Sequence, residues 1–144
     1  MFDSRSGREP RPFSQRVHMN PSVTRPEAPR ATPGTHPVTD MKQCIEDCER
    51  CYRVCFSMAM NHCLEQGGAH VEPNHFRLMT ICSNLCRLTA DAMLANFVLH
   101  EDLCRACARV CEECAASCRD LDGMEECVDA CEHCARSCTS MLKH

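Results

Sequence analysis

A run of five cysteines between Cys104 and Cys118 is the part of the sequence best suited to chemistry. The gaps between successive cysteines are 3, 4, 3 and 4 residues. Because an α-helix has about 3.6 residues per turn, this spacing places all five sulfurs on one face. Alanine, glutamate and arginine fill the gaps, and neither glycine nor proline interrupts the run. The sequence therefore predicts a helix that carries thiols where leucine usually stands.

Pairs of cysteines at spacing i and i+4 recur beyond this run. The Cβ atoms of such a pair lie about 5–6 Å apart on a helix, whereas those of a disulfide lie about 3.5–4.5 Å apart. An intrahelical disulfide would be strained, but a metal ion between the two sulfurs would fill the gap. We therefore expect all sixteen cysteines to bind metal. The seven pairs are Cys44 and Cys48, Cys51 and Cys55, Cys82 and Cys86, Cys107 and Cys111, Cys114 and Cys118, Cys127 and Cys131, and Cys134 and Cys138, which leaves Cys63 and Cys104.

The charge of the metal decides which ion suits these thiols. Soft thiolates select Cu(I), zinc or iron–sulfur clusters. Zinc in a structural site takes four ligands, so each tetrathiolate would bury a net charge of −2. Cu(I) is monovalent and binds two or three sulfurs, so on the order of sixteen ions could be neutralised by sixteen thiolates. Iron–sulfur clusters typically use cysteines on loop-like runs. The pattern therefore favours multiple Cu(I) ions per chain.

Four helices are predicted to carry the cysteines. They span residue 40 to about 66, a stretch that begins after Pro73 and runs to about 98, about 101 to 119, and 125 to about 142. Asp40 is expected to cap the first, and Gly67 and Gly68 to end it. Short connections favour antiparallel neighbours. The fold class is therefore all-α, an antiparallel up-down four-helix bundle with a cysteine-lined core.

Methionine and histidine side chains are predicted to stand at one end of this core. The stripe of the first helix continues to Met58 and His62, whereas Cys63 lies about a quarter-turn away and could be merely structural. We expect Met58, His62 and His75 to bind Cu(I) and pass it to the cysteines, since thioethers and imidazoles add no negative charge. The alternative is that they only close the bundle. Met79 and Met124 are predicted to lie at the same end, and Met41, Met93, His100 and Met141 at the opposite end. The histidines that we predict not to bind metal are His18, His36, His133 and His144.

The cysteine content also bears on location. Sixteen of 144 residues are cysteine, a density typical of secreted proteins held by disulfides. The first 39 residues, however, contain no apolar run that could serve as a signal peptide. We therefore expect a cytoplasmic protein, because thiols stay reduced in the cytosol and cysteine-rich patterns there more often bind metal.

Residues 1–39 differ from the rest in composition. They contain seven of the eight prolines, and six arginines against three acidic residues. Few large apolar side chains and no periodicity indicate a disordered tail ahead of one domain, residues 40–144.

The formal net charge of the chain is −4, and because residues 1–39 carry +3, the domain carries −7. This acidic domain argues against nucleic-acid binding, and no 18-residue apolar run could span a membrane.

Residues 40–142 resemble the four-helix-bundle cysteine-rich copper storage proteins. The resemblance rests on the repeated pairs and on the phrases His62-Cys63-Leu64-Glu65-Gln66-Gly67-Gly68 and Cys104-Arg105-Ala106-Cys107-Ala108-Arg109-Val110-Cys111. It implies a homotetramer of bundles, each storing many Cu(I) ions on cysteines that point into its core. The twin-arginine signal of the exported branch is missing, so the chain is similar to the cytosolic branch. Helix 73–98 departs from the densest pattern, with Leu85, Thr89 and Met93 at positions where further thiols could stand.

Other functions remain open at this level. A zinc or general soft-metal sink would use the same thiols. A thiol–disulfide oxidoreductase could use Cys104 and Cys107, but it needs a thiol of low pKa at a helix N-terminus, usually beside a strand. A disulfide-stapled module is disfavoured by compartment and spacing. We expect no enzyme, but a Cu(I) store and buffer that serves copper homeostasis.

Overall fold

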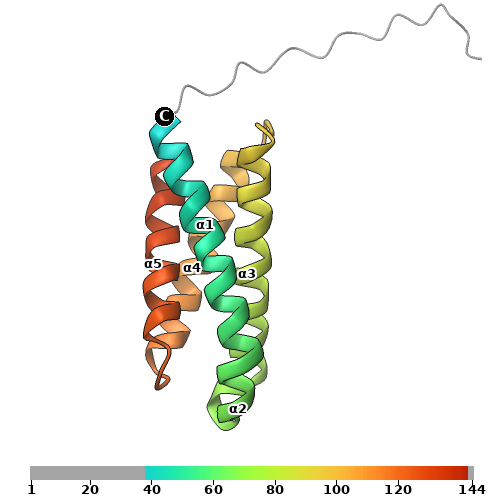
Figure 1. Ribbon diagram of the computed structural model, residues 1–144, viewed down its shortest axis with the longest axis vertical. Coiled ribbons are helices and arrows are strands. Elements are labelled where there is room, and N and C mark those ends of the chain that lie inside the picture. Colours follow the sequence, from blue (N-terminus) through green and yellow to red (C-terminus); the bar gives the residue numbers. More distant parts are fainter. Residues whose placement is uncertain (1–37, 143–144) are drawn as a thin grey trace, which may run out of the picture. The chain divides into compact units, whose positions relative to one another are not determined.

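The computed structural model describes residues 38–142, and these are helical apart from short connections (Figure 1). The predicted disordered tail lies outside the described residues except for its last two, and so do His18, His36 and His144. The elements in chain order are α1 (Val38–Met58), a π-helical segment (Ala59–Cys63), α2 (Leu64–Gln66), a 3-10 helix (Gly68–Val71), α3 (Pro73–Leu94), α4 (His100–Arg119) and α5 (Glu125–Ser140).

These elements form an up-down four-helix bundle. The helical run from α1 through α2 is one rod, and α3, α4 and α5 follow with alternating direction (Figure 1). Around the bundle, α1 packs against α3, α3 against α4, α4 against α5, and α5 against α1. Because the connections are short, helices that are consecutive in the chain pack side by side and antiparallel. The first and last helices then close the bundle. The predicted all-α fold is confirmed.

The first helix begins earlier than predicted. It starts at Val38, so Asp40 lies inside the first turn and is not the N-cap. An acidic side chain there still stabilises the positive end of the helix dipole. The rod ends at Gln66 as predicted, where Gly67 has a φ of 65°, a conformation that glycine adopts without a steric penalty.

Helix α3 ends four residues before the predicted position, at Leu94. Asn96 has a φ of 50°, and its backbone N–H donates to the carbonyl of Met93, while that of Phe97 donates to the carbonyl of Ala92. This pair of hydrogen bonds is the Schellman motif, in which asparagine can replace the usual glycine. At the other end, the Glu72 carboxylate accepts from the N–H groups of Asn74 and His75, both at 3.0 Å. The predicted bounds of α4 and α5 agree within two residues.

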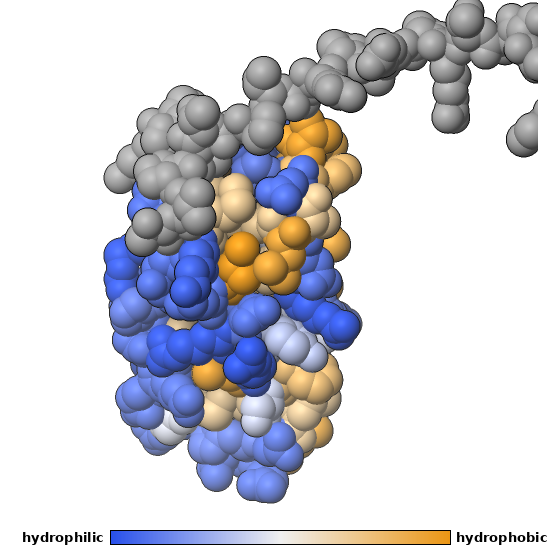
Figure 2. Space-filling model, turned by 45° about the horizontal axis from the view of Figure 1, so that its top comes forward, coloured by the Kyte–Doolittle hydropathy of each residue, from blue (hydrophilic) through white to orange (hydrophobic). Residues whose placement is uncertain are grey.

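The core differs from that of an ordinary bundle. All sixteen cysteines are 0% exposed, and the other buried apolar side chains among residues 40–142 are alanine and methionine. Reduced cysteine packs as a small hydrophobe, so it can replace leucine in a helical core. Larger apolar side chains lie instead on the surface, where Figure 2 shows them between polar ones. The exposed ones include Phe56, Leu64, Ile81, Leu88, Leu94, Phe97, Val98 and Leu99.

Candidate metal centre

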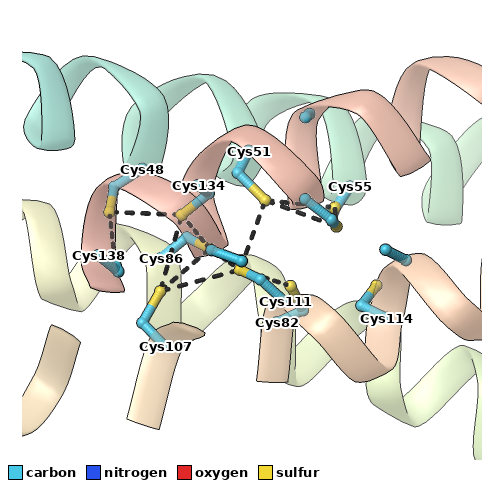
Figure 3. Close-up of a cluster of buried hydrophobic side chains, with 14 of the residues drawn as sticks. Cys48, Cys51, Cys55, Cys82, Cys86, Cys107, Cys111, Cys114, Cys134 and Cys138 are labelled. Carbon is cyan, nitrogen blue, oxygen red and sulfur yellow. Dashed lines mark hydrogen bonds between the residues drawn. The ribbon is translucent and has the colours of Figure 1, made fainter. Parts of the chain in front are cut away.

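Thiols from all four helices converge along the axis of the bundle (Figure 3). Their Sγ atoms form five groups in which all members lie within 4.8 Å of one another. Every member is buried. From one end to the other, the groups are Cys44, Cys104 and Cys138; Cys48, Cys107, Cys134 and Cys138; Cys51, Cys86, Cys111 and Cys134; Cys51, Cys55, Cys82 and Cys131; and Cys55, Cys114, Cys127 and Cys131.

Neighbouring groups share members. Cys138 and Cys134 each belong to two groups, and so do Cys51, Cys55 and Cys131. The five groups therefore form one continuous array, which we call the thiol ladder and which contains fourteen of the sixteen cysteines. Cys118 extends it, with its Sγ 3.6 Å from that of Cys127. Only Cys63 stands apart from these sulfur contacts in the described part of the chain.

The sulfur separations suit metal binding. The i, i+4 pair Cys51 and Cys55 has its Sγ atoms 3.8 Å apart, and across helices Cys55 and Cys127 approach to 3.2 Å. A disulfide would need about 2.05 Å, and all sixteen cysteines are free thiols. Two metal–sulfur bonds of about 2.3 Å that meet at about 120° span about 4 Å. The pairs Cys51 with Cys55 and Cys107 with Cys111, at 3.8 and 4.0 Å, thus have sulfur separations that one metal ion could bridge.

Burial and mutual hydrogen bonding control the protonation of these thiols. A thiol that accepts hydrogen bonds has a lowered pKa, as Cys51 does beside Cys111, and one that donates has a raised pKa, as Cys111 does beside Cys107. At the ladder's end, the hydrogen bond to Cys138 lowers the pKa of Cys104. The bond to Cys44 and burial outweigh it and raise that pKa to about 12. Thiols of raised pKa, such as Cys104 and Cys111, must therefore release their protons as soft metal ions bind.

The π-helical segment changes which residues face the core after Cys55. The α-helical stripe predicts Met58 and His62 there, but Ala59 and Cys63 are the residues that are fully buried. In a π-helix the hydrogen bond spans i to i+5, so the turn contains one extra residue. The next residue that faces the core therefore comes one position later in the sequence than in an α-helix. The prediction that Cys63 lies off the stripe is therefore wrong. Met58 is half-buried at the edge of the core.

Two histidines contact the connection between α4 and α5 instead of the thiols. The Nε2 atoms of His62 and His70 donate to the carbonyl of Asp122, at 3.2 and 3.0 Å. Their rings meet edge-on with centroids 5.2 Å apart. Sequence reasoning missed His70, because a single histidine in a short connection has no periodicity to mark it.

His75 is the predicted histidine that lies deepest. It is 5% exposed, its Nδ1 lies 2.7 Å from the hydroxyl of Ser117, and its Nε2 is buried without a hydrogen-bond partner. Burial lowers the pKa of His75, assisted by the nearby His70, so the imidazole is neutral at physiological pH. A neutral imidazole with a free nitrogen is a soft-metal ligand. His133, by contrast, is exposed and bonds the carbonyl of Asp129, outside the core as predicted.

Comparison with known proteins identifies the family. A profile described as copper storage protein matches residues 38–143. The uncharacterised cysteine-rich protein YhjQ of Bacillus subtilis (strain 168) is 34% identical over 75 residues, 52% of this chain and 68% of that protein. No helix among residues 38–142 is long and apolar enough to cross a membrane.

Solved structures agree with the profile. A protein from Nitrosospira multiformis is 48% identical with a TM-score of 0.71, over 72% of this chain and 94% of that one. The Cu(I)-bound copper storage protein BsCsp3 is 32% identical with a TM-score of 0.66, over 71% and 97%. The metal-free copper storage protein 3 of Bacillus subtilis is 31% identical with a TM-score of 0.61, over 69% and 96%. With its buried thiol ladder, the chain therefore belongs to the copper storage protein family.

Proposed function

We propose that this bundle stores multiple Cu(I) ions on the thiolates of its ladder. The observation that carries the proposal is the sharing of cysteines between neighbouring groups. A thiolate that belongs to two groups can bridge two ions, and Cu(I) is satisfied by two or three sulfurs. Because each Cu(I) offsets one thiolate, the core stays near neutral as it fills.

Zinc would occupy fewer sites on the same thiols than Cu(I). Among the four-thiol groups, at most two have no cysteine in common with each other, so at most two tetrathiolate zinc ions could occupy them together. Each would leave −2 in a core from which water is excluded. We therefore expect excess Cu(I) to displace zinc, and zinc that stays bound at four sulfurs per ion would favour the zinc alternative.

Anaerobic titration of the reduced protein with Cu(I), followed by elemental analysis, tests the storage function. We expect many ions per chain, up to on the order of sixteen, one per thiolate. A His133→Ala variant serves as a control, because this exposed side chain should leave capacity unchanged. A plateau at a single ion, or no binding, would contradict storage.

A thiol–disulfide oxidoreductase fits the geometry poorly, and we propose that the role is non-catalytic. Such enzymes need an accessible thiol of lowered pKa, but Cys104 and Cys107 are both 0% exposed. The pKa of Cys104 is raised, and although hydrogen bonding with Cys111 lowers the pKa of Cys107, burial keeps that thiol away from a substrate. Rapid reduction of a small disulfide substrate by the metal-free protein would contradict this assignment.

His75 is the best placed of the predicted histidine ligands. Its unpartnered Nε2 is buried one turn before Met79 on α3, so it can hold Cu(I) on the way to the thiols. Met58 and His62 stand nearer the surface of the same end. Copper would thus pass from neutral donors to the more tightly binding thiolates of Cys55, Cys118 and Cys127.

We also propose where the protein is located and how many chains associate. Free thiols persist in a reducing compartment, which supports a cytoplasmic location. We propose a homotetramer, which the family resemblance implies and which exposed apolar side chains on α1 and α3, including Phe56, Ile81 and Leu88, support. Sedimentation equilibrium measures this directly, and a monomer at micromolar concentration would refute the tetramer.

A further inference from the structure

We propose that Cys63, Met79 and Met124 form a separate site for one Cu(I) ion, beyond the thiol ladder. The site lies at the end of the bundle where the α1–α3 and α4–α5 connections meet. It combines one thiolate with two neutral thioethers, unlike the all-thiol groups of the ladder. The inference rests on the proposed storage function, because it assumes that Cu(I) reaches this end of the core.

The three sulfur atoms are already close. The Cys63 Sγ lies 3.7 Å from the Sδ of Met79 and 3.8 Å from that of Met124. Two metal–sulfur bonds of about 2.3 Å at a trigonal centre place the sulfurs about 4 Å apart. All three side chains are 0% exposed. Small shifts of flexible methionine side chains would therefore complete a three-sulfur site shielded from water.

The π-helical segment is the element that builds the site. Without its extra residue, the α-helical stripe would turn His62 inward and Cys63 away. The segment is held by contacts on its outer side: the Asn61 amide donates to the carbonyl of Ser57 at 2.9 Å, and His62 donates to Asp122. π-helical turns are costly and occur frequently at functional sites. Here the turn places a thiol between two thioethers.

The α4–α5 connection packs closely against the π-helical segment. A Cβ added to Gly123 would lie 2.8 Å from the Cε1 of His62, and Gly123 has a φ of 77°. Glycine therefore lets the α4–α5 connection approach the His62 ring closely. Met124 follows immediately and is fully buried. The contact that holds the π-helical turn and the residue that supplies a thioether thus belong to the same short segment.

Charge determines which ion fits. Cu(I) replaces the proton of the Cys63 thiol, which is released to water, and no electron is transferred. One monovalent ion and one thiolate are then neutral, whereas a divalent ion would leave a buried charge of +1. Thioether sulfur is a soft ligand that favours Cu(I) over harder ions. The site therefore suits soft monovalent ions.

Selenium X-ray absorption of the selenomethionine-labelled protein, loaded anaerobically with Cu(I), tests the site directly, because selenium replaces the methionine sulfurs as an equally soft donor. We expect a copper neighbour at bonding distance from selenium. The double variant Met79→Leu/Met124→Leu should lose most of that signal and about one Cu(I) per chain, since leucine preserves volume but cannot ligate. Met60→Leu is the matched control, because Met60 lies in the π-helical segment and is only half-buried.

The outcomes separate the two proposals. A full complement of Cu(I) with no copper near selenium would overturn the Cys63 site and leave storage intact. A selenium–copper signal equally strong in the double variant would also overturn it, because other methionines would then be the ligands. Failure of the wild-type protein to bind Cu(I) at all would refute storage and the site together.

Discussion

The two ends of the bundle offer different sulfur chemistry. The thiol end consists of Cys44, Cys104 and Cys138, with the Sδ of Met93 3.9 Å from Cys104. The mixed-donor end consists of Cys63, Met79, Met124 and His75. Among these, only the thiol of Cys63 can become anionic on binding Cu(I). Anionic ligands hold Cu(I) tightly, whereas neutral ones hold it without accumulating charge. We therefore predict that copper is exchanged at the mixed-donor end and retained along the ladder.

The largest expected effect concerns capacity. Replacing all three thiols of the thiol end (Cys44→Ser/Cys104→Ser/Cys138→Ser) should remove about three Cu(I) ions per chain, whereas Cys63→Ser should remove about one. Cys138 is shared between two groups, so its loss also weakens the next group. Elemental analysis after anaerobic loading measures both, with circular dichroism to verify folding. Equal losses would remove the distinction between the ends.

The second effect is on stability of the metal-free, reduced protein at alkaline pH. Burial raises the pKa of Cys63, and that of Cys104 rises to about 12. Above about pH 8.5 these thiols ionise in the unfolded chain but keep their protons in the folded one. At these two positions the unfolded state then binds fewer protons, so the contribution of Cys63 and Cys104 to stability is retained below about pH 8.5 and falls as pH rises, by up to about 1.4 kcal/mol per pH unit for each of the two thiols.

Urea unfolding between pH 7 and 10 would measure this slope. The variants Cys104→Ser and Cys63→Ser compare the two ends, and each should flatten the slope by removing one raised thiol. A slope that neither variant changes would contradict the raised pKa values of these two thiols.

A third effect concerns the rate of loading. The double variant His62→Ala/His75→Ala should take up Cu(I) more slowly and reach nearly the same capacity, because imidazoles supply transient ligands and the thiols supply the store. His75→Ala alone should account for most of the delay, since its Nε2 is the buried and unpartnered one. Stopped-flow absorbance of Cu(I)–thiolate formation measures the rate. An unaltered rate would place copper uptake elsewhere, including at the thiol end.

The smallest effect concerns the contact that holds the mixed-donor end. Gly123→Ala should reduce the free energy of unfolding by about 1–3 kcal/mol, because it combines a positive φ with a clash against His62. Gly68→Ala is the matched control, with a φ of 54° and no atom within 4 Å of the added Cβ. It should cost less, about 1 kcal/mol, from the positive φ alone. Thermal unfolding compares the two, and equal costs would show that the His62 contact is unimportant.

Much of the ladder was predictable from spacing alone. Gaps of three and four residues place the cysteines of each helix on one face, and every predicted pair is buried in the common core. The choice of Cu(I) over zinc also followed from charge and ligand number. These inferences succeed because helix periodicity is a local property, and because short connections leave four helices few ways to pack.

The ends of the helices depended on contacts that the sequence pattern does not reveal. The Schellman turn at Asn96 shortened α3, since asparagine can adopt a positive φ where only glycine is usually expected. The π-helical turn before Cys63 contacts the α4–α5 connection, some sixty residues away in the chain, through the hydrogen bond from His62 to the Asp122 carbonyl and the close approach of Gly123. Which face of each helix carries sulfur could thus be read from the spacing of the cysteines. The contact of Cys63 with Met79 and Met124 could not, because it needs a one-residue change of helical register that local periodicity does not encode and that only the packed bundle reveals.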